Sequence, residues 1–253
     1  MLNKFVYNFF SCVCLCIILV LNCVYAQSPK INFTSLTSKD GLSSNIVTVI
    51  LKDRYGLMWF ATEDGLNKYD GTSFTVYRHS DTDTNSLPAN DVISLHEDRA
   101  GNLWIGTNGG SLIVYDRKKD HFKRANSFAG FDAQNNVVRA ICSDYLGRVW
   151  VSNYVGLSVL DPKTNRVWRP VLQPAGASES SDPVVQSIYE DSKRRMWIGT
   201  SDGLYLYNRE ENSFSYYRHY PAVASSLVGN AVRSITEDAT GTIWIGTEQG
   251  LSM

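Results

Sequence analysis

Short stretches in which apolar and polar residues alternate recur along most of the chain, and turn residues separate them. Val92, Ser94 and Leu95 belong to one such stretch, and Val232 and Ile235 belong to another. Alternation with a period of two predicts β-strands, because successive side chains of a strand point to opposite faces. After residue 26, no stretch shows the apolar spacing of three and four residues that a helix needs. The pattern therefore predicts an all-β fold.

Each unit of this pattern contains a tryptophan in a closely similar local sequence. The separations between successive tryptophans are 45, 46, 47 and 47 residues, and the surrounding sequence is Leu-Trp-Ile-Gly-Thr or a near match. These residues are Trp59, Trp104, Trp150, Trp197 and Trp244. Four short antiparallel strands repeated at this period fit the blades of a β-propeller, in which four-stranded sheets pack around a central channel. We predict about five blades, four of them complete and the fifth cut short.

The repeat also gives approximate boundaries for the predicted elements. Residues 27–253 are expected to form a partial β-propeller. Its blades are expected at residues 45–78, 90–125, 136–170, 184–218 and 230–253. The tryptophan of each blade is expected on the second strand, where it fills the space between neighbouring blades and buries on the order of 200 Å². Stacking against a ligand is the alternative role for these side chains.

A turn with aspartate first and glycine fourth precedes most of these tryptophans. Asp98 to Gly101 is one example, and this combination predicts a tight hairpin because Asp caps the turn and Gly tolerates positive φ. In the fourth unit Arg194 stands where the others have Gly. A left-handed conformation there is expected to cost about 1 kcal/mol.

The first 26 residues differ from the repeats and resemble a secretory signal peptide. Lys4 stands near the start, residues 12–20 are apolar, and Ala26 precedes the expected cleavage point. An uncleaved membrane anchor is the alternative, but Asn22 interrupts a short apolar run. We therefore predict a signal peptide at residues 1–26 and a periplasmic location.

Cysteine usage limits the chemistry of the exported part. Four of the five cysteines fall within the predicted signal peptide, which leaves Cys142. Cleavage would therefore exclude an internal disulfide and a zinc site built from several cysteines. Cys142 occupies the repeat position of Leu51 and Tyr189, so we expect a small buried residue and not a nucleophile.

Charge and motifs exclude further classes of function. The formal net charge is −1 and no basic run stands out, so we expect no binding of nucleic acid. The sequence contains no nucleophile elbow, phosphate-binding loop or dinucleotide fingerprint, and no cluster with metal-ligand spacing. His79 and His219 occupy one repeat position and are expected to belong to the framework. We predict no metal, no cofactor and no catalytic residue.

One stretch of the repeat resembles a known family. Residues 90–116 contain Asp98, Gly101 and the sequence Leu-Trp-Ile-Gly-Thr around Trp104. This combination resembles the two-component regulator propeller repeat, and the resemblance extends over residues 31–253. In that family the repeats form the periplasmic part of hybrid two-component sensors. Members usually carry two seven-bladed propellers, an immunoglobulin-like domain, a membrane helix and a histidine kinase core.

The resemblance implies that this chain is a fragment of such a receptor, without kinase or membrane parts. Its expected partners are the missing propeller blades and the downstream receptor domains, and residues 31–36 would complete the last blade of a full ring. An incomplete ring leaves sheet faces and strand edges uncovered. We therefore also expect self-association through the uncovered blade edges.

The resemblance further implies an extracytoplasmic ligand-sensing module whose ligands are oligosaccharides. The candidate contacts are polar and aromatic residues in the turns after the tryptophan strands, which converge on one face of a propeller. They are Glu63, Asp64, Asn108, Asn153, Tyr154, Ser201 and Asp202. A plain turn role is the alternative for each of them.

Two other functions are compatible with a propeller. An enzyme such as a lyase or a glycan hydrolase would need paired carboxylates or a metal-bound histidine at the channel mouth, and Glu63 with Asp64 is the one adjacent acidic pair among the candidate turn residues. A quinoprotein-like scaffold usually has Thr before the turn glycine, and Thr240 with Gly241 alone reproduces that pair.

Overall fold

The computed structural model describes residues 31–253 except residues 110, 126–136, 154–155 and 173–182. The predicted signal peptide, residues 1–26, lies outside the described residues. The chain forms two units, residues 1–36 and 37–253. In the first unit the described residues, 31–36, contain no helix or strand. The second unit contains every described sheet.

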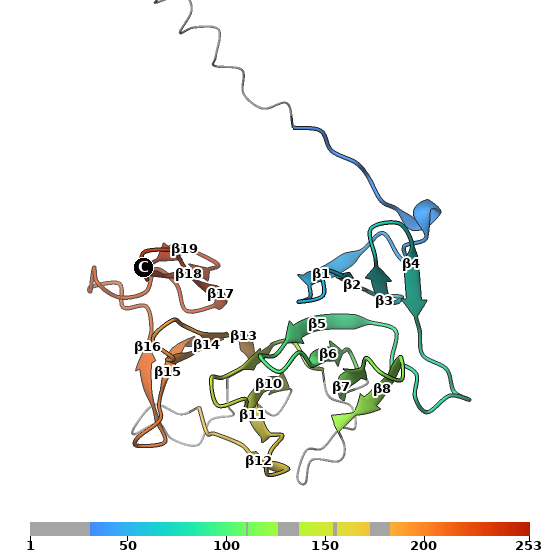
Figure 1. The fold of residues 1–253 in the computed structure, drawn as a ribbon. Helices are drawn as coiled ribbons and strands as arrows, with labels where there is room; N and C mark the ends of the chain where they lie inside the picture. The colour runs from blue at the N-terminus through green and yellow to red at the C-terminus, as the bar shows by residue number, and fades with distance from the viewer. Residues whose placement is uncertain (1–30, 110, 126–136, 154–155, 173–182) are drawn as a thin grey trace, which may run out of the picture. The chain divides into compact units, whose positions relative to one another are not determined.

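The second unit begins with a single 3₁₀ turn, η1 (Ser38–Asp40), and continues as five antiparallel sheets (Figure 1). The strands of the first three sheets are β1 (Val47–Lys52), β2 (Met58–Thr62), β3 (Gly65–Tyr69), β4 (Phe74–Tyr77), β5 (Val92–Glu97), β6 (Leu103–Thr107), β7 (Ser111–Asp116), β8 (His121–Arg124), β9 (Ile141–Ser143), β10 (Val149–Asn153), β11 (Gly156–Asp161) and β12 (Arg166–Trp168). Those of the last two are β13 (Val185–Glu190), β14 (Met196–Thr200), β15 (Gly203–Asn208), β16 (Ser213–Tyr217), β17 (Val232–Glu237), β18 (Ile243–Thr247) and β19 (Gly250–Ser252).

Each sheet is built from strands that follow one another in the chain. Four sheets have four strands, and the fifth has three described strands, β17, β18 and β19. The first strands of successive sheets contact one another, β1 with β5, β5 with β9, β9 with β13 and β13 with β17. Sheets joined in this way are propeller blades, with the first strands beside the central channel. The predicted all-β propeller of four complete blades and one shorter blade is confirmed.

The hairpin before each tryptophan depends on a buried or partly buried aspartate. In the third blade, Oδ1 of Asp144 accepts the backbone N–H groups of Leu146 and Arg148, and Oδ2 accepts the indole N–H of Trp150 at 3.1 Å. The same indole–carboxylate bond occurs in every blade, at 2.9 Å for Asp53–Trp59, 2.8 Å for Asp98–Trp104, 2.9 Å for Asp191–Trp197 and 2.7 Å for Asp238–Trp244. One side chain therefore closes the turn and orients the tryptophan.

The turn conformations agree with the sequence-based expectation. Gly56 and Gly101 have φ angles of 86° and 89°, which a residue with a Cβ adopts at a cost. Arg194 adopts a φ of 63° at the corresponding position of the fourth blade. Arg194 therefore adopts the left-handed conformation of the glycine that it replaces.

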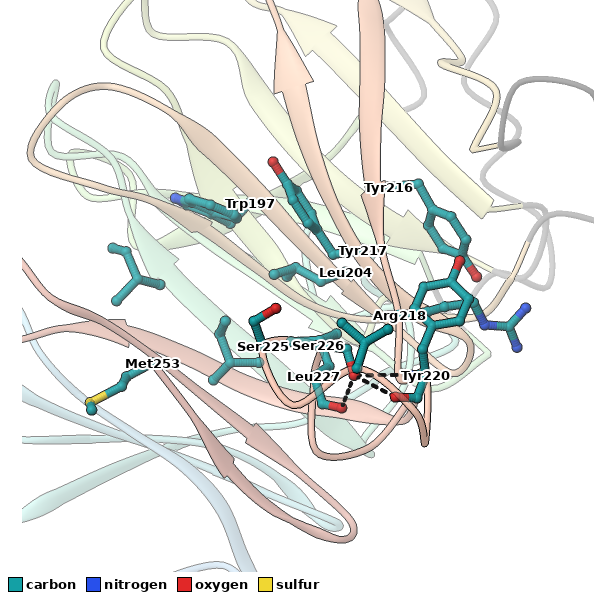
Figure 2. Close-up of a pocket in the computed structure, with 13 residues that line it drawn as sticks. Trp197, Leu204, Tyr216, Tyr217, Arg218, Tyr220, Ser225, Ser226, Leu227 and Met253 are labelled. Carbon is teal, nitrogen blue, oxygen red and sulfur yellow. Dashed lines mark hydrogen bonds between the residues drawn. The ribbon is translucent and has the colours of Figure 1, made fainter.

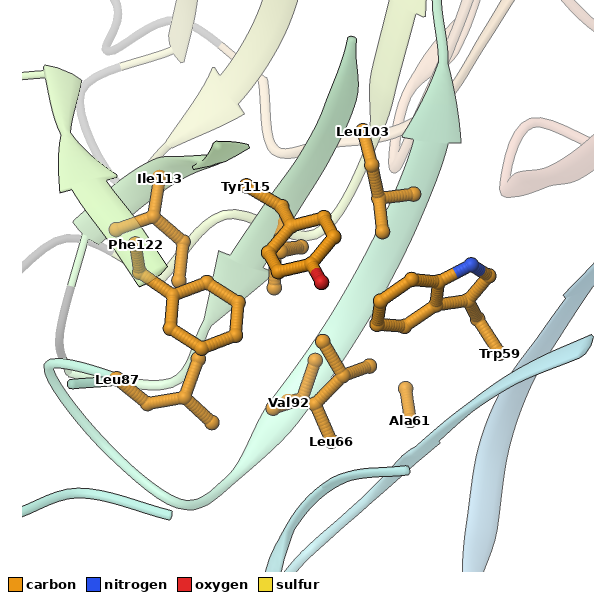
Figure 3. Packing of buried hydrophobic residues seen from close by; sticks show 10 residues of the cluster. Trp59, Ala61, Leu66, Leu87, Val92, Leu103, Ile113, Tyr115 and Phe122 are labelled. Atoms are coloured by element: carbon orange, nitrogen blue, oxygen red, sulfur yellow. The ribbon is translucent and has the colours of Figure 1, made fainter. Parts of the chain in front are cut away.

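Four of the five tryptophans lie between consecutive blades. In the first such interface, Trp59 and Leu66 of the first blade pack against Val92, Leu103 and Tyr115 of the second (Figure 3). Trp59, Trp104 and Trp150 are at most 2% exposed. Trp197 is only partly buried, and it packs against the apolar cluster that joins the fourth and fifth blades. Trp244 is also partly buried and belongs to none of the four clusters described between the blades.

The opposite face of the first blade is exposed. Each later blade packs an apolar residue of its first strand against the preceding blade. Ile141 and Ile235 are 9% exposed at this position, and Leu95 and Ile188 are partly buried. The equivalent residue of the first blade, Ile50, is 60% exposed. Self-association through such an uncovered face stays a prediction.

A second polar contact joins most consecutive blades. The glutamate that ends the first strand accepts a backbone N–H from the hairpin of the preceding blade, as Glu190 does from Tyr145 at 2.8 Å. At the joint between the second and third blades, Ser143 replaces this glutamate. There Nε2 of His96 accepts the backbone N–H of Ser143 at 2.9 Å.

The contact of His96 with Ser143 makes the interface between the second and third blades sensitive to acid. Burial lowers the pKa of His96 to about 4, against the opposing effect of the Asp98 carboxylate. Because this value lies below the unfolded-state pKa of about 6.5, the contribution of neutral His96 is complete above that pH and is lost as the pH falls toward 4. On acidification from pH 7.5 to pH 5, we expect the titration of His96 to reduce the free energy of unfolding by about 2 kcal/mol.

Urea unfolding of the wild type and of His96→Gln at these two pH values measures the effect. Glutamine keeps a hydrogen-bond acceptor but does not titrate, so the variant is expected to lose less stability on acidification. All other titrating groups are common to both proteins. Equal losses in the two proteins would show that His96 does not control the acid response.

Candidate ligand-binding face

The turns between the second and third strands lie beside the starts of the first strands. The backbone N–H of Asn108 donates to the carbonyl of Asp91 at 2.8 Å, and that of Ser201 donates to the carbonyl of Val184 at 2.9 Å. Glu248 makes the equivalent bond in the fifth blade. These turns and the starts of the first strands therefore lie on one face of the propeller, which we call the binding face.

Acidic residues of the first blade's turn have protein partners. Oε1 of Glu63 accepts a hydrogen bond from the hydroxyl of Ser44 at 3.2 Å. Asp64 forms an ion pair with Arg78 at 2.9 Å, and both side chains are roughly half exposed. These contacts give the two candidates a role in the turn, and a role in ligand binding stays a prediction.

The candidates in the other turns have similar local contacts. The Asn108 amide donates to the carboxylate of Asp91 at 2.8 Å, and the Ser201 hydroxyl accepts the backbone N–H of Val184 at 3.2 Å. Asp202 pairs with Arg218 at 2.7 Å. Asn153 ends β10, but its side chain and all of Tyr154 lie outside the described residues.

A small pocket opens between the first strands at the channel. Its volume is about 290 Å³ and its lining is Ile93, Arg139, Gln186 and Arg233. We call it the channel pocket. Three of these residues lie at β-bulges in β5, β13 and β17. A bulge turns a side chain away from the regular alternation of its strand.

The channel pocket residues occupy a single position of the repeat. The preceding residue is valine in every blade, whereas this position holds Thr48, Ile93, Arg139, Gln186 and Arg233. The framework around the position is therefore uniform while its chemistry differs from blade to blade. These residues are not among the sequence-based candidates, although their divergence within a regular repeat is the signal that could have found them.

The polar groups of the pocket are partly connected. With the Gln186 amide oriented to donate to the carbonyl of Val232 at 3.0 Å, its oxygen accepts from Nη1 of Arg233 at 3.2 Å. Nη2 of Arg233 pairs with Oε1 of Glu248. Arg139 is exposed and has no ion-pair partner in the part of the chain that the structure describes.

A larger pocket, of about 450 Å³, lies between the fourth and fifth blades (Figure 2). Trp197, Leu204 and Tyr217 line one side of it, and Ile243 lies on the fifth blade. Between the first two blades the corresponding space contains Tyr115 and Phe122, which come from a third and a fourth strand. We therefore interpret this pocket as blade-packing space and not as a ligand site.

Other reactive side chains belong to the framework. Cys142 is 8% exposed, and burial raises the pKa of its thiol to about 12, so the reactive thiolate is suppressed. Nδ1 of His79 lies 2.7 Å from the carbonyl of Leu87, and His219 makes the same contact with Leu227 at 2.6 Å. Both expectations, a buried cysteine and a framework histidine pair, are confirmed.

The described residues lack two further features. They contain no group of three or more His, Cys, Asp or Glu side chains placed to hold a metal ion. Within the same residues, no helix has the length and apolar character needed to span a membrane.

The hairpins and tryptophan strands of four blades, the third excepted, match a known family model. Residues 41–64, 86–109, 178–202 and 226–249 match the two component regulator propeller. Four segments of this chain are therefore similar to the two-component regulator propeller repeat. Histidine kinase P4 from Formosa agariphila carries a stretch that is 44% identical over 62 residues, which are 24% of this chain and 4% of that protein.

Solved structures share the propeller fold of this chain. The extracellular domain of a putative one component system from B. thetaiotaomicron has a TM-score of 0.68 at 21% identity, over 89% of this chain and 28% of that one. The extracellular domain of a putative hybrid two component system from the same species has a TM-score of 0.54 at 24% identity, over 86% and 41%. Virginiamycin B lyase from Staphylococcus aureus has a TM-score of 0.59 at 14% identity, over 87% and 71%. The chain thus spans less than a third of the first of these structures.

Proposed function

We propose that this chain is an extracytoplasmic ligand-sensing propeller module of a two-component signalling receptor, and that its ligand is an oligosaccharide. The observation that carries the proposal is the match of four repeat segments to the two component regulator propeller. The propeller is shared with two extracellular domains of putative signalling systems. The signal-peptide-like residues 1–26 agree with export.

The binding face supports recognition of a polar ligand. Carbohydrate sites combine a few polar groups that orient hydroxyls with apolar surfaces that cover sugar rings. The turns of the face present Asn108 and Ser201, and the channel pocket adds an amide and an apolar side chain beside them. A protein of this kind binds its ligand without changing it.

A propeller enzyme is the second candidate, because a lyase is among the proteins with this fold. Glycan cleavage needs a general acid and base, commonly two carboxyl groups about 5 to 10 Å apart. The side chains that line the channel pocket include no carboxyl group and no histidine. This lining favours binding over turnover.

Calorimetric titration of the purified chain against a panel of neutral and acidic oligosaccharides tests the proposal. We expect saturable binding of at least one oligosaccharide, and no new reducing ends or unsaturated products in a parallel assay. Asn108→Ala with Ser201→Ala is expected to weaken that binding. Lys163→Ala is the control, because Lys163 contacts the carbonyl of Leu146 in a hairpin outside the binding face. Product formation, or no binding across the panel, would overturn the proposal.

A further inference from the structure

The channel pocket concentrates positive charge. Two of its four lining side chains are arginines, Arg139 and Arg233, and the other two, Ile93 and Gln186, are uncharged. Arg139 and Arg233 come from the third and fifth blades, so the propeller brings together two cations that are 94 residues apart in the sequence. The chain as a whole has a formal net charge of −1, so this concentration is local.

The positive charge of the pocket is only weakly neutralised within the protein. Arg139 has no acidic partner among the residues that the structure describes. Arg233 pairs with Glu248, but the two side chains are 56% and 53% exposed. Exposed ion pairs contribute at most about 1 kcal/mol, so a ligand anion can replace Glu248 at small cost.

The geometry of the arginine side chain selects the ligand chemistry. A guanidinium presents its N–H donors in a planar fork that matches a carboxylate or a sulfate, and these charge-assisted bonds are about twice as strong as neutral ones. Beside the two guanidinium groups, the Gln186 amide can bond a hydroxyl and Ile93 offers an apolar surface. The pocket volume of about 290 Å³ lies at the small end of the range for ligand sites.

We infer that the channel pocket is an anion subsite, in which Arg139 and Arg233 bind the carboxylate or sulfate group of an acidic oligosaccharide. This inference rests on the proposed function, and it names the class of ligand. The neutral turn residues of the binding face would then contact the rest of the oligosaccharide. Acidic sugars are thereby selected over neutral ones of the same length.

Matched pairs of oligosaccharides test the selection. The first pair is trigalacturonic acid and its methyl ester, and the second is a chondroitin sulfate hexasaccharide and its desulfated form. We expect a charged member to bind roughly tenfold or more tightly than its partner, with affinity falling as salt rises. The carboxylate pair and the sulfate pair distinguish the two sources of negative charge.

The arginines are tested by a charge-matched comparison of variants. Arg139→Gln with Arg233→Gln is expected to abolish the preference for the charged oligosaccharide. Lys118→Gln with Lys119→Gln removes the same charge, in a turn next to Arg117, which donates to the carbonyl of Gly101 away from the binding face. The lysine variant is expected to bind like the wild type. If neutral oligosaccharides bind as well as acidic ones, or the arginine variant keeps the preference, the anion subsite is wrong while the sensing proposal stands.

Melting temperatures measured with free anions distinguish a failure of the anion subsite from a failure of the proposed function. Relative to chloride of equal ionic strength, sulfate or galacturonate is expected to raise the melting temperature of the wild type by more than that of the arginine variant, because sulfate also stabilises folded proteins in general. If no oligosaccharide binds but this arginine-dependent shift occurs, the subsite is supported and carbohydrate sensing fails. If neither anion shifts the wild type more than the variant, the anion subsite is refuted.

Discussion

Asp144→Ala is expected to reduce the free energy of unfolding by roughly 3 to 5 kcal/mol, because it leaves buried partners of a charge unpaired. The Asp144 side chain is fully buried, and its Oδ2 accepts Arg148 at 2.6 Å and Arg209 at 3.1 Å in addition to the indole of Trp150. Without it, the Arg148 guanidinium and the indole N–H lose this acceptor, while Arg209 keeps Glu190 and the carbonyl of Arg194. The hairpin also loses the bonds to two backbone N–H groups.

The ionisation of this carboxyl supports the same expectation. Burial acts to raise the pKa of Asp144, but hydrogen bonds from Trp150 and Arg148 outweigh it and hold the pKa below its usual value. A lowered folded-state pKa means that the stabilisation is fully present above about pH 4 and is lost as the pH falls further. At pH 7 the Asp144→Ala variant is therefore expected to show the full reduction in the free energy of unfolding.

Asp238→Ala is the matched control, measured by urea unfolding followed through tryptophan fluorescence. Asp238 makes the same indole bond and the same turn bonds in the fifth blade, but it forms no ion pair within the described part of the chain. Its removal is expected to cost clearly less than that of Asp144. Similar losses for the two variants would show that the arginine pairs contribute little.

The blade framework could be predicted from the sequence because it repeats. The tryptophan period, the alternation and the turn glycines each indicate the same four-stranded unit, and the structure contains it. The residue-level function of Asp53 and its equivalents could be predicted only in part. Their turn-capping role follows from local sequence, whereas the indole bond depends on a residue six positions later that the hairpin folds back onto them.

The candidate site was less accessible to sequence reasoning. The turn residues could be selected because they follow the tryptophan at a fixed offset, but their partners could not. Asp64 and Arg78 meet only because β3 and β4 return the chain to the same end of the blade. Arg139 and Arg233 line the same pocket only because the third and fifth blades are arranged around one channel. Long-range pairing of this kind leaves no local pattern beyond the divergence of one repeat position.

Trp59→Ala is expected to have an effect of similar size, roughly 3 to 5 kcal/mol of the free energy of unfolding. Trp59 is 0% exposed, and Tyr115 of the next blade lies edge-on to it with ring centroids 5.0 Å apart (Figure 3). Truncation to alanine removes this contact and leaves a cavity in the interface between the first two blades. The cost depends on how far Leu66 and Leu103 can move into that cavity.

Two further variants identify the cause of the loss. Trp59→Phe keeps most of the apolar contact but removes the indole donor to Asp53, so it is expected to cost less than the alanine variant. Trp244→Ala truncates the equivalent side chain where it is only partly buried and is likewise expected to cost less. Urea unfolding of the three variants measures the difference. Equal losses for Trp59→Ala and Trp244→Ala would mean that the tryptophans stabilise their own sheets, and that burial between blades is not what gives them their effect.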